Sequence, residues 1–201
     1  IAQGISGVMG QPVIVDNRGG TYVAEEVVLR TAPDGYTLLV EASGLWIEPL
    51  FHKTPYDPLL DFSPITMTNR TPLLRIANSA LAVSSVKDLI AQAKARPGAL
   101  NYAIQSVGGG NHLAAELFKS MAGVNMTSVP YKTTPQAIGD VINGQVQVMF
   151  ANLSVALPQA KAGKLKALAV TSPQPSALAP DLPTVAASGL AGYEIAAIFS
   201  V

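Results

Sequence analysis

The chain contains no cysteine, and its 201 residues include only two histidines, His52 and His112. The lack of cysteine excludes disulfide bonds, thiolate catalysis and cysteine-based zinc sites. The two histidines lie far apart in the sequence and form no His-Glu-x-x-His motif, so we expect no bound metal ion. Because neither of the common glycine-rich nucleotide-binding motifs occurs, we also expect no cofactor.

Charged side chains are scarce as well. They make up 13% of the chain, and the 13 basic residues balance the 13 acidic ones. No basic stripe exists, so binding to nucleic acid or to an anionic membrane has no electrostatic support. Hydrophobic residues reach 49%, yet no run approaches the roughly 18 apolar residues of a membrane-spanning helix. This composition predicts one large or two modest domains with a sizeable core.

Short apolar runs alternate with stretches of helical periodicity along most of the chain. We expect strands at 13–15, 36–40, 65–68, 73–77, 100–104, 126–129, 146–150, 165–170 and 194–201. Ser85 should cap a helix that has Asp88 at its third position and ends before Pro97. Thr134 should cap another helix, with Pro135 at its first position. The alternation predicts an α/β fold with parallel sheets.

The sequence QSVGGGNHL, which starts at Gln105, joins the expected strand 100–104 to an expected helix. Glycines at a helix N-terminus can turn main-chain N–H groups toward a bound anion. The same glycines can also serve a tight turn that requires a positive φ angle. No Lys-Ser or Lys-Thr pair follows and the G-x-G-x-x-G spacing is absent, which excludes both common phosphate-binding loops.

Ligands of open parallel sheets gather at the carboxyl ends of the strands. The loops that follow the neighbouring expected strands, at 131–134, 151–154 and 171–172, should therefore form further walls beside the glycines. A similar loop, 41–44, follows a strand in the first half of the chain. Two halves that each present such loops imply a cleft between two lobes.

Catalysis has little support in the sequence. A G-x-S-x-G nucleophile motif is absent, and Ser106 lies near His112 without an identifiable acidic partner. No pair of close carboxylates is found in the expected cleft loops. We therefore expect a binding protein and not an enzyme.

Several segments resemble one protein family closely. They are GQPVIVDNR from Gly10, APDGYTLL from Ala32, PYDPLLDFSPI from Pro55, SVKDLIAQAKARPGALNYA from Ser85, HLAAELFKSMAG from His112, VPYK from Val129, INGQVQVMF from Ile142, AGKLKALAVTS from Ala162 and APDLPTVAASGLAGYE from Ala179. Together they resemble the extracytoplasmic solute-binding proteins of tripartite tricarboxylate transporters, the TctC-like or Bug family. The resemblance covers nearly the whole chain, in order.

The resemblance implies an α/β, two-lobed periplasmic binding protein of type 2, the Venus-flytrap fold. Residues 1–72 would form the first lobe, 194–201 would return to it, and 73–193 would form the second lobe. The chain would cross between lobes at 73–78 and near 192–195. Family members also have elements before the segment at Ile1 and after Val201, so the first lobe is expected to be incomplete here.

The resemblance also implies the function. Such a protein captures a small organic carboxylate and, by closing, presents it to membrane transporter subunits. It would be a periplasmic monomer whose signal peptide is not in this sequence. The alternative is a sensory module that reports the same ligand to a partner protein, because the fold alone does not determine the function.

Family members hold the carboxylate with main-chain N–H groups and hydroxyls of the strand-end loops. The ligand-binding residues implied here are Ser43, Gly44, Trp46, Ile104, Ser106, Gly108, Gly109, Gly110, Asn111, Tyr131, Thr133, Ala151 and Asn152. The three glycines would form the carboxylate cradle, each offering an N–H group.

This chain departs from the family pattern at several of these positions. Ile104 stands where the family usually has Ser, Ser106 stands for the first Gly, and Gly109 stands for a later Ser. Thr133 replaces a Gly, and Ala151 replaces an Asp that many members carry. These changes favour an apolar or aromatic carboxylate, although a repositioned carboxylate is an alternative.

Four side chains could bear on the site, and three of them have two interpretations each. Trp46 could stack on an aromatic ligand or pack within its lobe, and Tyr131 could reach the cleft from its strand end. His112 could cap or support the cradle, or contact the ligand directly. Arg75 could pair with an anionic ligand, but a salt bridge at the surface or hinge is the favoured interpretation.

Overall fold

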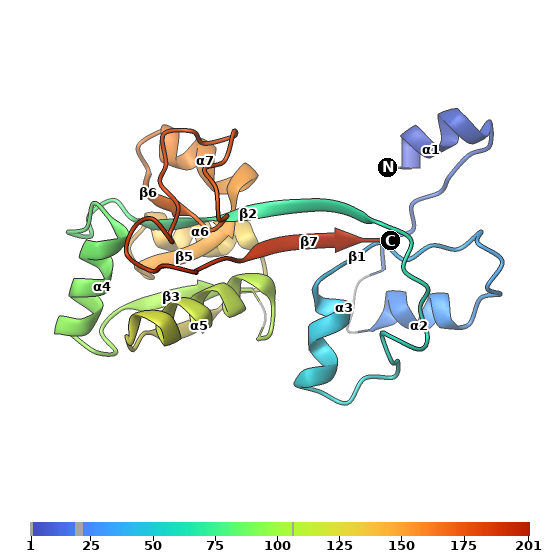
Figure 1. Cartoon of the computed structure of the whole chain (residues 1–201), viewed down its shortest axis with the longest axis horizontal. Coiled ribbons are helices and arrows are strands. Elements are labelled where there is room, and N and C mark those ends of the chain that lie inside the picture. The colour runs from blue at the N-terminus through green and yellow to red at the C-terminus, as the bar shows by residue number, and fades with distance from the viewer. Residues whose placement is uncertain (1, 19–21, 106) are drawn as a thin grey trace.

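The computed structural model describes residues 2–18, 22–105 and 107–201. Figure 1 shows two bodies joined by the long strand β2 (Met67–Asn78) and by β7 (Ala196–Ser200). Within the described ranges, no helix is both long and apolar enough to cross a membrane.

The second lobe is built on a mixed sheet. Its strands are the second half of β2, β3 (Asn101–Ile104), β4 (Thr127–Pro130), β5 (Val148–Asn152) and β6 (Leu165–Val170). Strand β3 pairs in parallel with both β4 and β5, as the strand–helix alternation predicts. Strand β2 lies between β5 and β6 and is antiparallel to both, because it enters from the first lobe.

Four helices cover this sheet: α4 (Val86–Ala95), α5 (Gly110–Ala122), α6 (Thr134–Ile142) and α7 (Leu153–Lys161). The predicted cap of α4 is confirmed, since Ser85 Oγ accepts the Asp88 N–H at 3.1 Å. The predicted cap of α6 is wrong by one residue. Thr133, not Thr134, accepts a main-chain N–H of the first turn, at 3.4 Å.

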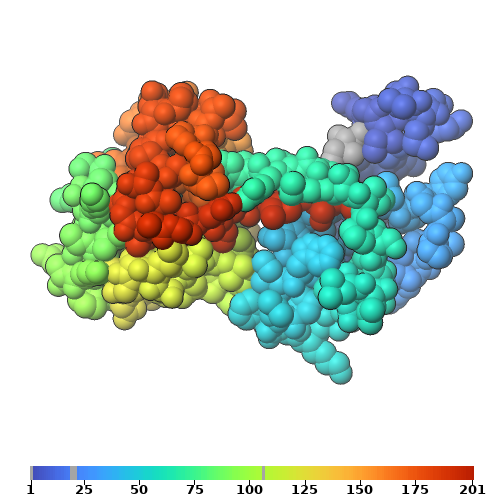
Figure 2. All heavy atoms as spheres, in the orientation of Figure 1, coloured from blue at the N-terminus to red at the C-terminus, as the bar shows by residue number. Residues whose placement is uncertain are grey.

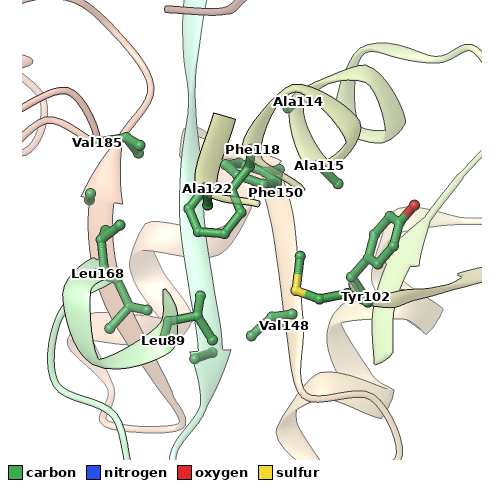
Figure 3. Close-up of a cluster of buried hydrophobic side chains, with 14 of the residues drawn as sticks. Leu89, Tyr102, Ala114, Ala115, Phe118, Ala122, Val148, Phe150, Leu168 and Val185 are labelled. Atoms are coloured by element: carbon green, nitrogen blue, oxygen red, sulfur yellow. The ribbon is translucent and has the colours of Figure 1, made fainter. Parts of the chain in front are cut away.

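The hydrophobic core of the second lobe has two layers, one on each face of the sheet. Side chains alternate along β2, so that Leu73 and Ala77 belong to one cluster while Leu74 and Ile76 belong to the other. Figure 3 shows the first cluster, in which Phe118 of α5 meets Phe150 of β5. A fully buried residue of this size contributes about 1.5–3 kcal/mol to stability through the burial of apolar surface.

Arg75 lies inside the first of these clusters. Its guanidinium carbon is 4.6 Å from the ring centroid of Phe118 and 4.3 Å from that of Phe150, and the side chain has no solvent exposure. Nη2 donates to the Met126 sulfur at 3.9 Å. Within the described residues, Nε and Nη1 have no partner. The predicted surface or hinge salt bridge is therefore wrong, because strand alternation turns this residue toward the core.

The first lobe contains α1 (Ala2–Met9), α2 (Val23–Leu29), β1 (Glu41–Ala42), α3 (Gly44–Ile47), the 3₁₀ helix η1 (Glu48–Leu50) and the first half of β2. Strand β7 lies between β1 and β2 and is antiparallel to both. The strands predicted at 13–15 and 36–40 are not formed. Ile14 is 86% exposed and Tyr36 is 88% exposed, and neither segment has a ladder partner among the described residues, without which a strand cannot persist.

The partners of β2 change along its length. Residues 67–72 pair with β7, whereas 73–78 pair with β5 and β6. At this point Thr171 Oγ1 accepts the Leu73 N–H at 2.8 Å and donates to the Ile195 carbonyl at 2.7 Å. One hydroxyl thus ties together the two chain segments that run between the lobes.

Candidate ligand-binding site

The connection from β3 to α5 lies at the end of the second lobe that faces the first lobe (Figure 1). Gly108 is buried, and its φ of +82° is a left-handed conformation that favours glycine. Gly109 is extended and occupies the N-cap position of α5 without a capping side chain. The turn interpretation and the anion interpretation of the glycines are therefore compatible, because Gly108 makes the turn that presents the helix N-terminus.

Of the three glycine N–H groups at this N-terminus, two have no acceptor among the described residues. Gly108 donates its N–H to Nδ1 of His112 at 3.0 Å. Among the described residues, the N–H groups of Gly109 and Gly110 have no acceptor. A Cβ atom added at Gly110 would meet no atom within 4 Å, so space is open beside the start of the helix. At most two of the three glycine N–H groups are thus available to a ligand, whereas the resemblance implies three.

Asn111, the residue after Gly110, has a buried side-chain amide. Its side chain is only 9% exposed, and Oδ1 accepts the His112 N–H at 3.0 Å. Nδ2 is buried and has no partner within the described residues. A buried donor without a partner costs about 1–3 kcal/mol, so this amide is suited to bind an acceptor supplied from outside the protein.

A polar cluster behind the turn holds His112 in position. The His112 ring stacks on Tyr102, with 6.4 Å between centroids, and its Nε2 is 3.7 Å from Oε1 of Glu116. Glu116 also bonds the Tyr102 hydroxyl and, at 2.7 Å, Nζ of Lys119. The predicted capping role of His112 is confirmed by its bond to Gly108.

The electrostatics of the cluster leave the helix N-terminus as the positive element of the site. Burial alone would raise the pKa of Glu116, but the hydrogen bonds from Lys119 and Tyr102 outweigh it and lower the pKa. Lys119, the single lysine or arginine of α5, is therefore engaged with an ionised carboxylate. An anion at the glycines would be held by main-chain dipoles and not by a free cationic side chain of α5.

The remaining residues predicted on the second lobe have varied surroundings. Ile104 and Ala151 are buried at the ends of β3 and β5, and Asn152 is half-buried at the N-cap of α7. Tyr131 is buried in the second core cluster. Burial and, after it, Asp140 on α6 raise the pKa of Tyr131 to about 12. Its ring thus leaves little surface for a ligand.

Thr133 is exposed, and its hydroxyl is used as the cap of α6. Ser106 lies outside the described residues.

On the first lobe, Ser43 precedes α3 and its side chain makes no capping bond, while Gly44 begins that helix. Trp46 lines a hollow of about 400 Å³ that is enclosed by first-lobe residues only: Val28, Leu29, Thr31, Ala32, Pro33, Gly35, Thr37, Leu38, Leu39, Glu41, Leu45, Asp61, Phe62, Ser63, Pro64, Ile65, Ser200 and Val201. This hollow does not include the glycine turn. The position of Trp46 favours packing within the lobe over stacking on a ligand at the glycines.

Phe51, which the sequence analysis does not single out, connects the two lobes. A Cβ atom added at Gly108 would lie 3.4 Å from Cδ2 and 3.6 Å from Cε2 of Phe51. Figure 2 shows the first-lobe segment around residue 50 beside the second lobe. Phe51 belongs to an irregular, proline-rich section whose pattern carries no signal for such a contact.

Comparison with known proteins identifies the family. The family described as "Tripartite tricarboxylate transporter family receptor", TctC, matches residues 1–201. The chain belongs to the TctC family. It is 34% identical to the protein BugT of Bordetella pertussis over 209 residues, an alignment that covers 100% of this chain and 63% of BugT. This TctC-family chain thus spans less than two thirds of the length of that relative.

Solved structures of similar proteins show the same fold. R. palustris Rpa4515 with adipate superposes with a TM-score of 0.89 at 37% identity, covering 99% of this chain and 68% of that one. The periplasmic binding protein BugD gives a TM-score of 0.84 at 31% identity, with coverage of 99% and 68%. The predicted periplasmic binding protein fold and the predicted family are both confirmed.

Proposed function

We propose that this TctC-family protein captures a small organic carboxylate at the N-terminus of α5, between its lobes, and delivers it to a tripartite tricarboxylate-type membrane transporter. The observation that carries the proposal is the pair of N–H groups of Gly109 and Gly110, which have no acceptor among the described residues. The buried Nδ2 of Asn111, the next residue, also has no partner among the described residues and supports it. The protein would act in the periplasm, as a monomer and without chemical conversion of its ligand.

Three such donors are energetically sufficient. A charge-assisted hydrogen bond to a carboxylate contributes about 1.5–3 kcal/mol. Three of them would contribute roughly 5–9 kcal/mol, and micromolar affinity corresponds to about 8 kcal/mol. The absence of an aimed arginine or lysine in the described site is therefore no obstacle to carboxylate binding.

An apolar carboxylate is the ligand class that we favour. Ile104 and Ala151, both buried, stand where the family pattern has a serine and an aspartate, so these two strand ends offer no polar side chain to a ligand. Rpa4515, which is 37% identical to this chain, was solved with adipate, an acid with an unbranched aliphatic body. An aromatic carboxylate remains in the proposed class.

Closure of the two lobes is part of the proposal. We place the first lobe at residues 1–72 with 194–201 and the second lobe at 73–193. The change of β2 partners between Pro72 and Leu73 supports this boundary. The bonds of Thr171 to Leu73 and Ile195 support a crossing point at both segments.

A thermal-shift screen against mono-, di- and tricarboxylates, both aliphatic and aromatic, tests the proposal. A ligand of the folded state stabilises it by about 2.7 kcal/mol at a hundredfold excess over Kd, so one chemical class should raise the melting temperature. A wild-type protein that responds to no carboxylate would contradict the proposed function.

The variant Gly110→Asp tests the location of the site. It places a negative charge where the carboxylate should bind, at a position with open space for a side chain. We expect the shift with the active acid to disappear while the melting temperature of the free protein stays the same or rises, since a carboxylate favours a helix N-terminus. Gly110→Asn, which has the same shape without the charge, is the matched control and should retain binding. Equal binding by both variants would place the ligand elsewhere.

A further inference from the structure

Phe51 approaches the glycine turn from the opposite lobe. It follows η1 in the first lobe, and its ring lies within van der Waals distance of the position that a Cβ atom of Gly108 would occupy. The side chain is nevertheless 52% exposed, so half of a large apolar surface faces solvent beside the candidate site. Gly108 directly precedes the two glycines whose N–H groups lack an acceptor among the described residues.

Two exposed apolar residues are the sequence neighbours of Phe51 and Gly108. Leu50, the residue before Phe51, and Val107, the residue before Gly108, are both exposed. Leu50 is on the first lobe and Val107 on the second, so each lobe contributes one of them. Polar N–H donors and an apolar rim thus meet at the same point between the lobes.

We propose that Phe51 is a specificity-determining residue, which contacts the apolar body of a ligand whose carboxylate is bound by Gly109 and Gly110. This proposal rests on the proposed function. The ring shields the carboxylate from water, and hydrogen bonds are stronger where water is excluded. It also gives no polar partner to a hydroxyl on the body of the ligand. The favoured class is therefore unbranched aliphatic dicarboxylates over short or hydroxylated acids.

The expected size of the effect follows from burial of methylene groups. Each CH₂ group removed from water strengthens binding by about fourfold in Kd. An acid with four methylene groups should therefore bind the wild-type protein more tightly than one with two. Without the ring, that gain should be largely lost.

Isothermal titration of the full chain with succinate, adipate and malate measures this. We expect Phe51→Ala to weaken adipate binding about tenfold and succinate binding less than threefold, with Phe51→Leu intermediate. Leu60→Ala is the control, because Leu60 is another exposed apolar residue of the first lobe, and it should match the wild type for every acid. Unchanged urea unfolding midpoints for both Phe51 variants would show that the fold is retained.

Two results would overturn the specificity role while leaving the proposed function intact. One is a Phe51→Ala variant that binds all three acids as the wild type does. The other is an equal loss for all three acids, in Phe51→Leu as well as Phe51→Ala, since a general role in lobe closure predicts no dependence on ligand chain length. A wild-type protein that binds none of the acids and none of the wider carboxylate panel would overturn both proposals together.

Discussion

Arg75 brings a charge into the core of the second lobe without a carboxylate partner among the described residues. Two phenylalanine faces offset part of the cost of removing the guanidinium from water, as cation–π contacts do. Burial still lowers the pKa of Arg75 well below its ordinary value, to about 10. Removal of the guanidinium from water thus disfavours its charged form.

Replacement of this residue should therefore stabilise the protein. We expect Arg75→Met, which keeps an unbranched side chain, to raise the free energy of unfolding by about 1–4 kcal/mol. Arg70→Met is the matched control on the same strand, where the arginine is half-exposed and pairs with Glu194; its change should stay below about 1 kcal/mol. Urea unfolding measures both. A loss of stability in Arg75→Met would mean that the cation–π contacts are worth more than the desolvation cost.

The N-terminal caps of α4 and α6 differ in the length and number of their hydrogen bonds. Ser85 Oγ accepts the Asp88 N–H at 3.1 Å, and Asp88 Oδ2 in turn accepts the Ser84 N–H at 2.9 Å. At α6, Thr133 Oγ1 is 3.4 Å from the Gln136 nitrogen, which is a longer and weaker bond. The reciprocal pair should hold the start of α4 more firmly than the single bond holds α6.

Substitution of the two caps should reveal this difference. We expect Ser85→Ala to lower the free energy of unfolding by about 1 kcal/mol, the usual value for an N-cap hydroxyl. Thr133→Ala should cost less than half of that. Both residues lie at the surface end of a helix, so urea unfolding of the two variants compares the caps directly. An equal cost for the two would show that bond length is a poor guide to cap strength here.

Buried tyrosines in both lobes make the whole molecule sensitive to alkaline pH. Burial, followed by Glu25, raises the pKa of Tyr56 in the first lobe to about 12, and burial also raises the pKa of Tyr131 in the second lobe to about 12. Burial raises the pKa values of Tyr102 and Tyr193 as well. All four phenols are therefore still protonated in the folded protein at a pH where the unfolded chain, with tyrosine near 10.0, has lost its protons.

Stability should therefore fall as the pH rises from about 10 to 12, because unfolding then releases protons. Arg75 has the opposite effect on stability. Its pKa is lower in the folded protein than in the unfolded chain, so its contribution to the free energy of unfolding rises between about pH 10 and pH 12. Four tyrosines outweigh one arginine, and urea midpoints should drop between pH 9 and pH 11. The drop should be steeper in Arg75→Met, which lacks the opposing group. A midpoint that is constant over this range would contradict the prediction.

The accuracy of sequence-based expectations differs between the two lobes for a physical reason. In the second lobe, strand–helix alternation predicts the parallel strands β3, β4 and β5, and the serine cap of α4 is correct. In the first lobe, segments 13–15 and 36–40 have strand patterns but no ladder partners among the described residues. The pattern of apolar residues in a segment indicates its preference for extended structure, whereas a stable strand also requires a second strand to pair with.

The sequence by itself determined the family, the α/β class of the second lobe, and a glycine-rich connection before α5. These depend on local backbone preferences and on side-chain order, which are present in the chain before it folds. Only the tertiary structure decided that His112 occupies the Gly108 N–H, that Arg75 is buried between two phenylalanines, and that Phe51 meets the glycine turn. For Arg75 and Phe51 the partners come from elements distant in sequence, and for His112 the contact requires a folded turn. No periodicity in one segment encodes such contacts.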